Sequence, residues 1–276
     1  MSIVYLNGNF LAEHEAVVPV LDRGFIFGDG VYEVIPVFNG KPFRLAEHLR
    51  RFARSLAGVG IASPLTDAGW HAMLEELLAR NAPAPASIYV QVTRGAAPRD
   101  LVPPGPLTPT VLAQVMPARY GVPQPIEVVV LEDIRWQRCD LKVISLLPNV
   151  LLKREALARG AADAILVRDG IVTEGVSSNV FAVVGGRLKT PAQTRHLLPG
   201  VTRDLIMELL AKEMPVVHDE PLTVAELRGA SEIFLSSSVR ELAPVARLDG
   251  MTVGSGAAGP VWRLAWDRYQ AFRDAW

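Results

Sequence analysis

The sequence predicts an α+β protein in two domains. Asn-Gly turn signals after its first strands indicate an antiparallel start, and helices with an apolar face interrupt the β-rich segments. The length of 276 residues exceeds the usual size of one domain. Residues 117–125, near the middle, resemble an interdomain linker. We therefore expect a first domain at residues 1–116 and a second at residues 126–276.

The first half begins with two strands that each end in an Asn-Gly pair, a strong hairpin signal. After them, Leu45, Leu49, Phe52 and Leu56 recur at helical spacing, and Thr66 is suited to cap a second helix. The expected elements are strands at residues 3–6, 32–38, 87–93 and 110–115 and helices at residues 44–59 and 66–80.

The second half runs strand, strand, helix, followed by two hairpins. Their turns are Asp169-Gly170 and Gly185-Gly186, and Gly160 can end the preceding helix. Thr223 and Glu226 have capping-box spacing. The expected elements are strands at residues 126–131, 141–146 and 232–236, helices at residues 150–159 and 203–213, and a last helix with Trp262, Trp266, Tyr269 and Phe272.

Composition and charge exclude several classes of partner. A formal net charge of -1 with dispersed arginines gives no broad attraction for nucleic acid or anionic membranes. The single cysteine, Cys139, cannot form an intramolecular disulfide, and we expect a cytoplasmic protein. No apolar stretch is long enough to span a bilayer, and the five histidines lack metal-ligand spacing. We expect neither a membrane segment nor a metal site.

Lys142 is the first candidate for chemistry, because it lies in the apolar run 141–147 in a chain with five lysines and 23 arginines. Burial lowers the pKa of an amine and makes it nucleophilic, which suits a Schiff base with an aldehyde cofactor such as pyridoxal phosphate (PLP). The alternative is a lysine at a strand edge whose ammonium extends to solvent. The run by itself leaves both open.

Other segments have the chemistry of a phosphate site. Gly200-Val201-Thr202 enters a helix, where backbone N–H groups favour an anion, and Ser236-Ser237-Ser238 offers further donors. The alternatives are an ordinary N-cap and a solvated loop. Glu174 lies in the polar loop 173–179. A glutamate there is an ordinary turn residue unless a cation, such as a protonated pyridine nitrogen, faces it.

The order of these motifs resembles the class IV, fold type IV PLP aminotransferases, and within them most closely the D-amino acid transaminases. The resemblance covers residues 3 to about 250. Its most specific motifs are DRGFIFGDGVYEV (22–34), QVTRGAAPR (91–99), EDIRWQRCDLK (132–142), TEGVSSNVF (173–181) and GVTRD (200–204). It implies a smaller N-terminal α/β sandwich domain and a larger C-terminal PLP-binding domain with a barrel-like β core.

The resemblance implies a role for each matching residue. Lys142 corresponds to the lysine that bonds to the cofactor and performs catalysis, and Glu174 to the glutamate that keeps the pyridine nitrogen protonated. The implied phosphate contacts are Arg51, Val201, Thr202 and Ser238. Ser177 and Ser178 correspond to the loop near the cofactor, and Leu198 to an apolar residue against its ring. A solvated helix arginine is the alternative for Arg51.

For substrate binding, Tyr32 and Arg99 match two of three groups that hold the α-carboxylate of a D-amino acid. The third departs from the family pattern, because Leu101 stands where a histidine is expected. Losing one charge-assisted hydrogen bond costs about 1.5 to 3 kcal/mol. Arg240 is either a compensating cation or a solvated loop residue.

The resemblance implies a ping-pong transaminase that moves an amino group between a D-amino acid such as D-alanine and a 2-oxo acid, pyruvate or 2-oxoglutarate. It also implies a homodimer. The alternatives of the same fold are an aminodeoxychorismate lyase, a branched-chain L-amino acid aminotransferase and an (R)-selective amine transaminase. A PLP-binding protein without catalysis is the alternative from another class.

Overall fold

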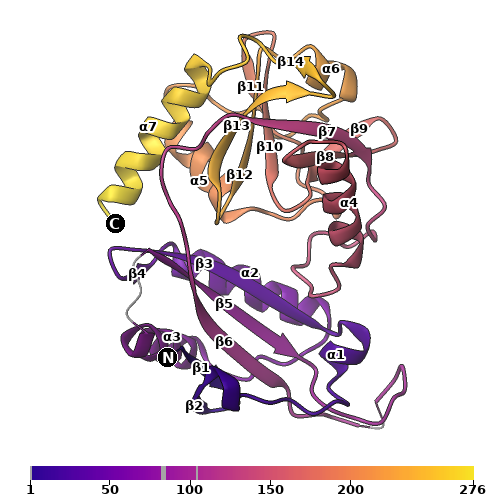
Figure 1. Ribbon diagram of the computed structural model, residues 1–276, viewed down its shortest axis with the longest axis vertical. Coiled ribbons are helices and arrows are strands. Elements are labelled where there is room, and N and C mark those ends of the chain that lie inside the picture. Colours follow the sequence, from indigo (N-terminus) through magenta and orange to yellow (C-terminus); the bar gives the residue numbers. More distant parts are fainter. Residues whose placement is uncertain (1, 82–84, 104) are drawn as a thin grey trace. The chain divides into compact units, whose positions relative to one another are not determined.

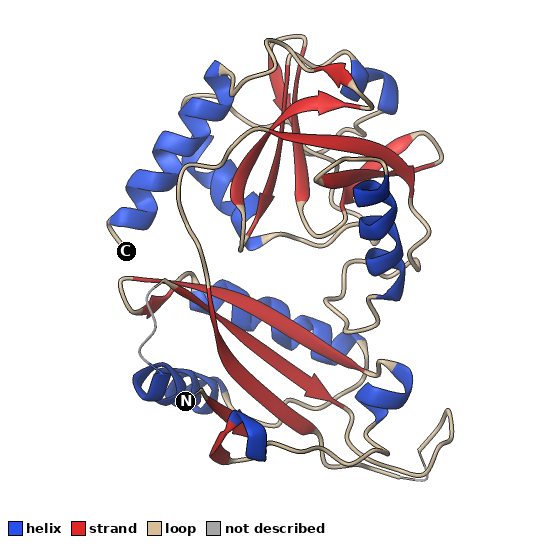
Figure 2. Ribbon diagram, viewed as in Figure 1, coloured by secondary structure: helices blue, strands red, loops and turns tan. Residues whose placement is uncertain are grey.

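The computed structural model describes residues 2–81, 85–103 and 105–276, and the chain divides into two compact units. The first unit comprises residues 1–119, 141–146 and Trp276, and the second comprises residues 120–140 and 147–275. Each unit contains one sheet with helices, which confirms the expected α+β class (Figures 1 and 2). The expected division at residues 117–125 places 141–146 in the second domain, whereas these residues pack in the first unit.

The first unit contains a six-stranded antiparallel sheet in the order β2-β1-β6-β5-β3-β4. Its elements are β1 (Ile3–Leu6), β2 (Asn9–Ala12), a 3-10 turn (Glu13–Glu15), α1 (Arg23–Phe27), β3 (Gly30–Phe38), β4 (Lys41–Pro42), α2 (Leu45–Gly58), α3 (Asp67–Asn81), β5 (Ala86–Thr93) and β6 (Thr110–Pro117). The two Asn-Gly hairpins form as expected, since both asparagines adopt positive φ.

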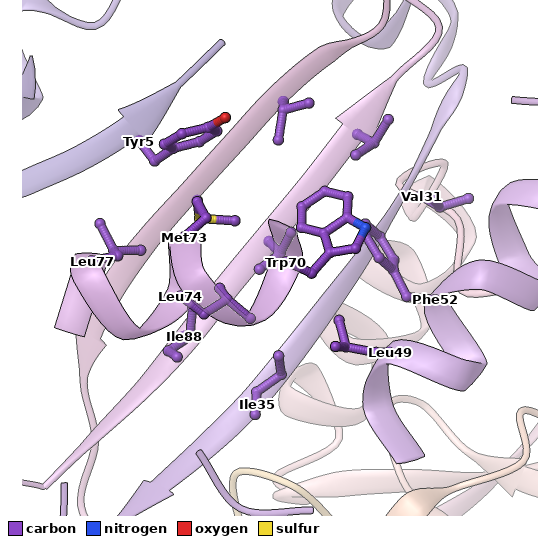
Figure 3. Packing of buried hydrophobic residues seen from close by; sticks show 14 of the residues in the cluster. Tyr5, Val31, Ile35, Leu49, Phe52, Trp70, Met73, Leu74, Leu77 and Ile88 are labelled. Carbon is purple, nitrogen blue, oxygen red and sulfur yellow. The ribbon is translucent and has the colours of Figure 1, made fainter. Parts of the chain in front are cut away.

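One face of this sheet carries the core of the first unit, where α2 and α3 bury their apolar sides (Figure 3). Ile35 of β3 and Ile88 of β5 are directly paired across the sheet and are fully buried. Phe52 of α2 meets Trp70 of α3 with ring centroids 5.3 Å apart in an edge-to-face arrangement. The predicted N-cap also forms, because the Gly69 amide donates to Thr66 Oγ1 over 3.1 Å.

The second unit contains a strongly curved eight-stranded sheet (Figure 2), which confirms the expected barrel-like β core. Seven strands follow the order β11-β10-β12-β13-β7-β8-β9, and β14 pairs with β13. The strands are β7 (Ile126–Glu132), β8 (Asp163–Arg168), β9 (Ile171–Gly175), β10 (Asn179–Val184), β11 (Arg187–Lys189), β12 (Glu232–Ser237), β13 (Glu241–Leu248) and β14 (Met251–Thr252).

Four helices pack on this sheet, namely α4 (Leu147–Ala158), α5 (Val201–Leu210), α6 (Val224–Arg228) and α7 (Pro260–Asp274). Both predicted hairpins form around turn residues of positive φ, and the Thr223–Glu226 capping box closes the start of α6. In α7, Trp262, Trp266 and Tyr269 are buried, as the aromatic pattern predicts. The second sheet therefore positions two features for the site: the end of β9 and the start of α5.

Candidate active site

Lys142 lies in a short extended segment at the edge of β3. The Tyr32 amide donates to the Lys142 carbonyl over 2.9 Å, and Val31 and Val143 form an isolated bridge. No regular strand forms at residues 141–146, so that prediction is wrong. The segment has the alternation of a strand, but its pairing with β3 is limited to this bridge and its flanking hydrogen bonds.

Alternation along this segment decides where the Lys142 side chain points. Leu141 and Val143 are buried in the core of the first unit, whereas Lys142 between them is only half-buried. Its ammonium nitrogen lies 4.2 Å from the centroid of the Tyr32 ring, a cation–π contact. The Lys142 amide donates to Ser55 Oγ of α2 over 3.1 Å, which anchors the segment. The amine is thus held against an aromatic ring and remains partly open to solvent.

Arg51 is a buried partner of Glu33 and not a solvated helix arginine. Its Nε donates to Glu33 Oε1 over 2.7 Å and its Nη2 to Glu33 Oε2 over 2.8 Å, which is a forked ion pair. The ring nitrogen Nδ1 of His48 lies 2.8 Å from Glu33 Oε2. His48, Arg51 and Ser55 share one face of α2, since they recur every three to four residues. This face presents three polar side chains to the first unit's interior.

Glu33 is fully buried, and its surroundings decide its protonation. Burial by itself would raise the pKa of its carboxyl, but the Arg51 guanidinium and then His48 lower the pKa well below its usual range. Burial lowers the pKa of His48, although the Glu33 carboxylate acts in the opposite direction and Lys142 adds to the lowering. The cluster therefore holds Glu33 as a carboxylate with Arg51 as its cation.

The two predicted substrate residues also lie in the first unit. Tyr32 is half-buried next to Tyr89, with ring centroids 5.6 Å apart. Arg99 is exposed on the loop between β5 and β6, with its guanidinium carbon 5.4 Å from the centroid of the Phe27 ring. Leu101, two residues further on, is 79% exposed, so the side chain that replaces the expected histidine reaches into solvent.

Glu174 lies near the end of β9 in the second unit, and both of its oxygens are engaged. Arg135 Nη1 donates to Oε1. Oε2 accepts the Leu198 amide at 3.0 Å and the Asn179 side-chain amide at 3.3 Å. The structure thus brings together Glu174 and Leu198, two residues predicted to contact one ring. It also adds Asn179, which lies five residues beyond Glu174 and donates to the Leu198 carbonyl over 2.9 Å.

Burial raises the pKa of the Glu174 carboxyl, against the Arg135 ion pair and the Leu198 hydrogen bond, which lower it. Arg135 is itself shared, because its Nε and Nη2 bind the two oxygens of Asp133 at 2.9 and 2.8 Å. One buried guanidinium thus links two carboxylates. The arrangement keeps Glu174 oriented while leaving it a stronger proton acceptor than an exposed glutamate.

The predicted phosphate residues Val201 and Thr202 form the buried first turn of α5. Gly200 is the N-cap, and within the described residues no side chain caps the helix there. A Cβ at Gly200 would lie 1.9 Å from Asn179 Oδ1, so only glycine allows this approach. The first backbone N–H groups of α5 are therefore available to an anion.

The predicted serines differ in burial. Ser177 is exposed, and Ser238 is half-buried in the turn after β12. Ser178 Oγ is buried and lacks a hydrogen-bond partner within the part of the chain that the structure describes, and the same holds for Ser236 Oγ. Ser236 is paired with Asn179 across β10 and β12, which places its side chain on the face that carries Asn179. Two unsatisfied hydroxyls thus accompany the Glu174 cluster.

Arg240 is an exposed loop residue that also pairs with a buried carboxylate. Its Nη1 lies 3.1 Å from Asp163 Oδ2, and Lys153 Nζ lies 3.3 Å from the other oxygen of the same carboxylate. The Asp163 carboxylate is buried between two cations. Arg240 and Asp163 thus form an ion pair within the second unit.

Sequence reasoning missed Glu33, His48, Arg135 and Asn179. Glu33 occupies a core position of β3, in alternation with Val31 and Ile35, and such a carboxylate requires a cation. Because this alternation is visible in the sequence, a buried carboxylate at Glu33 could have been predicted. Asn179 lies within the motif 173–181, whereas Arg135 is 39 residues from Glu174, so no local pattern identifies Arg135 as its partner.

Over residues 2–81, 85–103 and 105–276, no group of three metal-binding side chains occurs. Within the same residues no helix is long and apolar enough to cross a membrane. The first unit contributes the Lys142 amine and the Arg51–Glu33 pair, and the second contributes the Glu174 cluster with its two unsatisfied hydroxyls. Within the second unit, a buried carboxylate and an uncapped helix start suit an anionic organic cofactor with a ring nitrogen.

The chain belongs to the class IV amino-transferases, since residues 30–248 match that family. This match spans Lys142, Glu174 and the start of α5. Membership confirms the resemblance that the motifs indicated, and it makes the protein an aminotransferase.

Two relatives of this chain are D-alanine aminotransferases. The D-alanine aminotransferase of Bacillus licheniformis is 39% identical over 261 residues, which cover 94% of this chain and 92% of that protein. The D-alanine aminotransferase of Staphylococcus epidermidis strain RP62A is 39% identical and covers 95% of each chain. Among solved structures, the branched-chain aminotransferase of Thermoproteus uzoniensis with norvaline has a TM-score of 0.90 and 26% identity, covering 99% of this chain and 95% of that one.

Proposed function

We propose that the protein is a PLP-dependent transaminase that moves an amino group between a D-amino acid such as D-alanine and a 2-oxo acid, pyruvate or 2-oxoglutarate. The observation that carries this proposal is the Lys142 amine, held 4.2 Å from the Tyr32 ring in a chain 39% identical to a D-alanine aminotransferase. The amine lies beside the ring of Tyr32, the residue that the family pattern assigns to the substrate α-carboxylate.

The residues present fit PLP. The phosphate requires N–H donors, and α5 of the second unit begins with uncapped N–H groups. The family pattern assigns the accompanying cation to Arg51 of the first unit. The ring nitrogen requires a carboxylate, and Glu174 is buried with a raised pKa. Ser178 and Ser236 have buried hydroxyls that lack partners among the described residues, as expected for groups that meet a ligand. The cofactor, when bound, supplies an electron-withdrawing ring that stabilises negative charge at the substrate α-carbon.

In the proposed mechanism each residue has one task. Lys142 would hold the cofactor through its Nζ and would carry the proton that leaves the substrate α-carbon. Glu174 holds a proton at the ring nitrogen. By the family pattern, the phosphate would be bound by Arg51, Val201, Thr202 and Ser238, and the ring would be lined by Ser177, Ser178 and Leu198. Tyr32 and Arg99 bind the α-carboxylate of both substrates, which react one after the other in a ping-pong sequence.

We further propose a homodimer. Val17, Val20 and Phe25, which lie within nine consecutive residues, are each more than two-thirds exposed in this chain, and contiguous exposed apolar patches mark interaction surfaces. Light scattering of the purified protein is expected to give twice the chain mass of 30.0 kDa. Active enzyme at the mass of one chain would contradict the proposal.

A coupled assay tests the reaction itself. The enzyme with D-alanine and 2-oxoglutarate is expected to release pyruvate, which lactate dehydrogenase detects, and double-reciprocal plots are expected to be parallel. A branched-chain L-amino acid aminotransferase is the second candidate, because the Thermoproteus uzoniensis structure is similar over nearly the whole chain. L-Leucine as the better donor, measured as 4-methyl-2-oxopentanoate formation, would favour that candidate.

A further inference from the structure

The loop between β5 and β6, residues 94–109, carries Arg99 and is held at both of its ends by Asp22. Thr93 at the end of β5 and Thr110 at the start of β6 both donate their hydroxyl hydrogens to Asp22 Oδ2, at 3.0 and 2.7 Å. Asp22 is buried and also caps α1 by accepting the Gly24 amide at 2.8 Å. The short helix α1 is therefore tied to the base of this loop.

The next residue, Arg23, reaches from the base to the outer part of the loop. Its Nη1 donates to the Asp100 carbonyl over 2.6 Å and its Nη2 to the Leu101 carbonyl over 2.9 Å. Its Nε donates to Asp29 Oδ2 over 2.8 Å. The residue is 4% exposed, although the two residues whose carbonyls it binds are exposed. A buried guanidinium thus fixes two consecutive peptide groups immediately after Arg99.

The position of Arg23 is set by groups outside the loop tip, by which we mean Asp100 and Leu101. Asp29 is shared with Arg94, whose Nε and Nη2 bind its two oxygens at 2.8 and 3.0 Å. Phe27 of α1 lies under both arginines, since the guanidinium carbon of Arg23 is 4.9 Å and that of Arg99 is 5.4 Å from its ring centroid. Arg23 therefore holds the backbone that follows Arg99, and the Arg99 side chain lies against the same helix.

From this geometry we infer that Arg23 is a positioning residue for recognition of the substrate α-carboxylate, acting through the loop that presents Arg99. The inference rests on the proposed function, in which Arg99 binds that carboxylate. Without the fork of Arg23, the loop tip would lose its two charge-assisted bonds, and Arg99 would sample many positions. Both the amino acid and the 2-oxo acid carry the carboxylate, so both would bind more weakly.

Arg23→Lys is the main test variant. A lysine keeps the charge beside Asp29 but is a point donor that cannot span two carbonyls and a carboxylate together. The expected result is a rise in KM for D-alanine and for 2-oxoglutarate, with kcat/KM falling roughly 10- to 100-fold and kcat little changed. Hydrogen exchange of the holoenzyme, followed in peptides that cover residues 96–103, is expected to become faster.

Arg50→Lys is the matched control, because Arg50 is an exposed arginine of the first unit that pairs with Glu47 over 3.6 Å. It is expected to leave both KM values and the exchange of residues 96–103 close to those of the parent. Arg99→Gln, measured in parallel, tests the role of Arg99 in substrate binding separately from the positioning role of Arg23. Unchanged KM values in Arg99→Gln would overturn the proposed role of Arg99 and this inference with it. Raised KM values in Arg99→Gln together with parental KM values in Arg23→Lys, whatever the exchange rates, would overturn the positioning role alone.

Discussion

The ammonium nitrogen of Lys142 lies 4.2 Å from the centroid of the Tyr32 ring, and both residues belong to the same compact unit. The contact follows from backbone pairing, because the Tyr32 amide donates to the Lys142 carbonyl and alternation turns both side chains away from the core. A proposed catalytic amine and a proposed substrate-binding phenol are thus brought together by one local structure.

Replacement of Lys142 by alanine is expected to abolish transamination while the fold is kept. The side chain is half-buried and the segment is anchored by backbone bonds, so its loss leaves the core intact. Removing a positioned acid–base group typically costs about 10²- to 10⁴-fold. Steady-state assays and thermal unfolding measure the two effects. Lys41→Ala, an exposed lysine of β4 in the same unit, is the control and is expected to retain activity. Substantial turnover by Lys142→Ala would rule out its proposed role.

Glu174→Gln is expected to slow the half-reaction much more than it weakens cofactor retention. Glutamine can still accept from the Leu198 amide, but it carries no negative charge to hold a proton at the ring nitrogen. It also leaves Arg135 with Asp133 as its remaining carboxylate partner. Rapid-mixing absorbance with D-alanine measures the rate, and equilibrium dialysis measures retained PLP. A half-reaction rate equal to that of the parent would contradict the role of Glu174.

Glu33→Gln is expected to destabilise the first unit at neutral pH, because it removes the carboxylate that pairs with the buried Arg51. Breaking a buried ion pair costs about 3 to 5 kcal/mol. The folded-state pKa of Glu33 is lowered, so its stabilisation is fully present above the unfolded value of about 4.3 and is lost as the pH falls through the folded value. The difference between parent and variant should therefore shrink below about pH 4.

Urea unfolding at several pH values measures this difference. Glu76→Gln is the control, since Glu76 pairs with Arg80 at 2.7 Å on the exposed side of α3. An exposed pair of this kind contributes about 0 to 1 kcal/mol. Equal losses in the two variants at neutral pH would show that the Glu33 cluster does not stabilise the fold as described.

Local sequence patterns predicted those elements whose cause is local. The spacing of apolar residues predicted α2, and the Asn-Gly and Gly-Gly pairs predicted the hairpins, because periodicity and positive φ act over a few residues. Helix α1 was not among the predicted elements, because five residues are too few to show a helical period. The strand predicted at residues 141–146 did not form, since strand length depends on a partner more than 100 residues away.

The same distinction applies to the site. Lys142 and Glu174 were found because a lysine in an apolar run and a carboxylate in a family motif are visible in the sequence. Glu33, Arg135 and Arg23 were not assigned a role, because their partners are distant along the chain and are found only when the chain is folded. Family resemblance supplied what periodicity and spacing did not.

Leu101→His is expected to improve recognition of the α-carboxylate. The residue is 79% exposed, so the change introduces no cavity or clash, and a histidine adds one donor where the family pattern has it. A hydrogen bond to a charged group contributes about 1.5 to 3 kcal/mol when well formed. The KM for D-alanine should therefore fall, which initial-rate measurements would show, with Val102→His as the neighbouring control. Equal changes in both variants would mean that position 101 has no special relation to the substrate.

The roles of Lys142 and Glu174 are tested first by the visible absorption spectrum of the purified protein with PLP while D-alanine, and separately L-leucine, is added without a 2-oxo acid. We expect a yellow protein whose absorption band is lost with D-alanine and persists with L-leucine. Loss of the band with L-leucine alone would place the activity in the branched-chain class. A protein that takes up no PLP and remains colourless would contradict the central claim that Lys142 and Glu174 serve this cofactor.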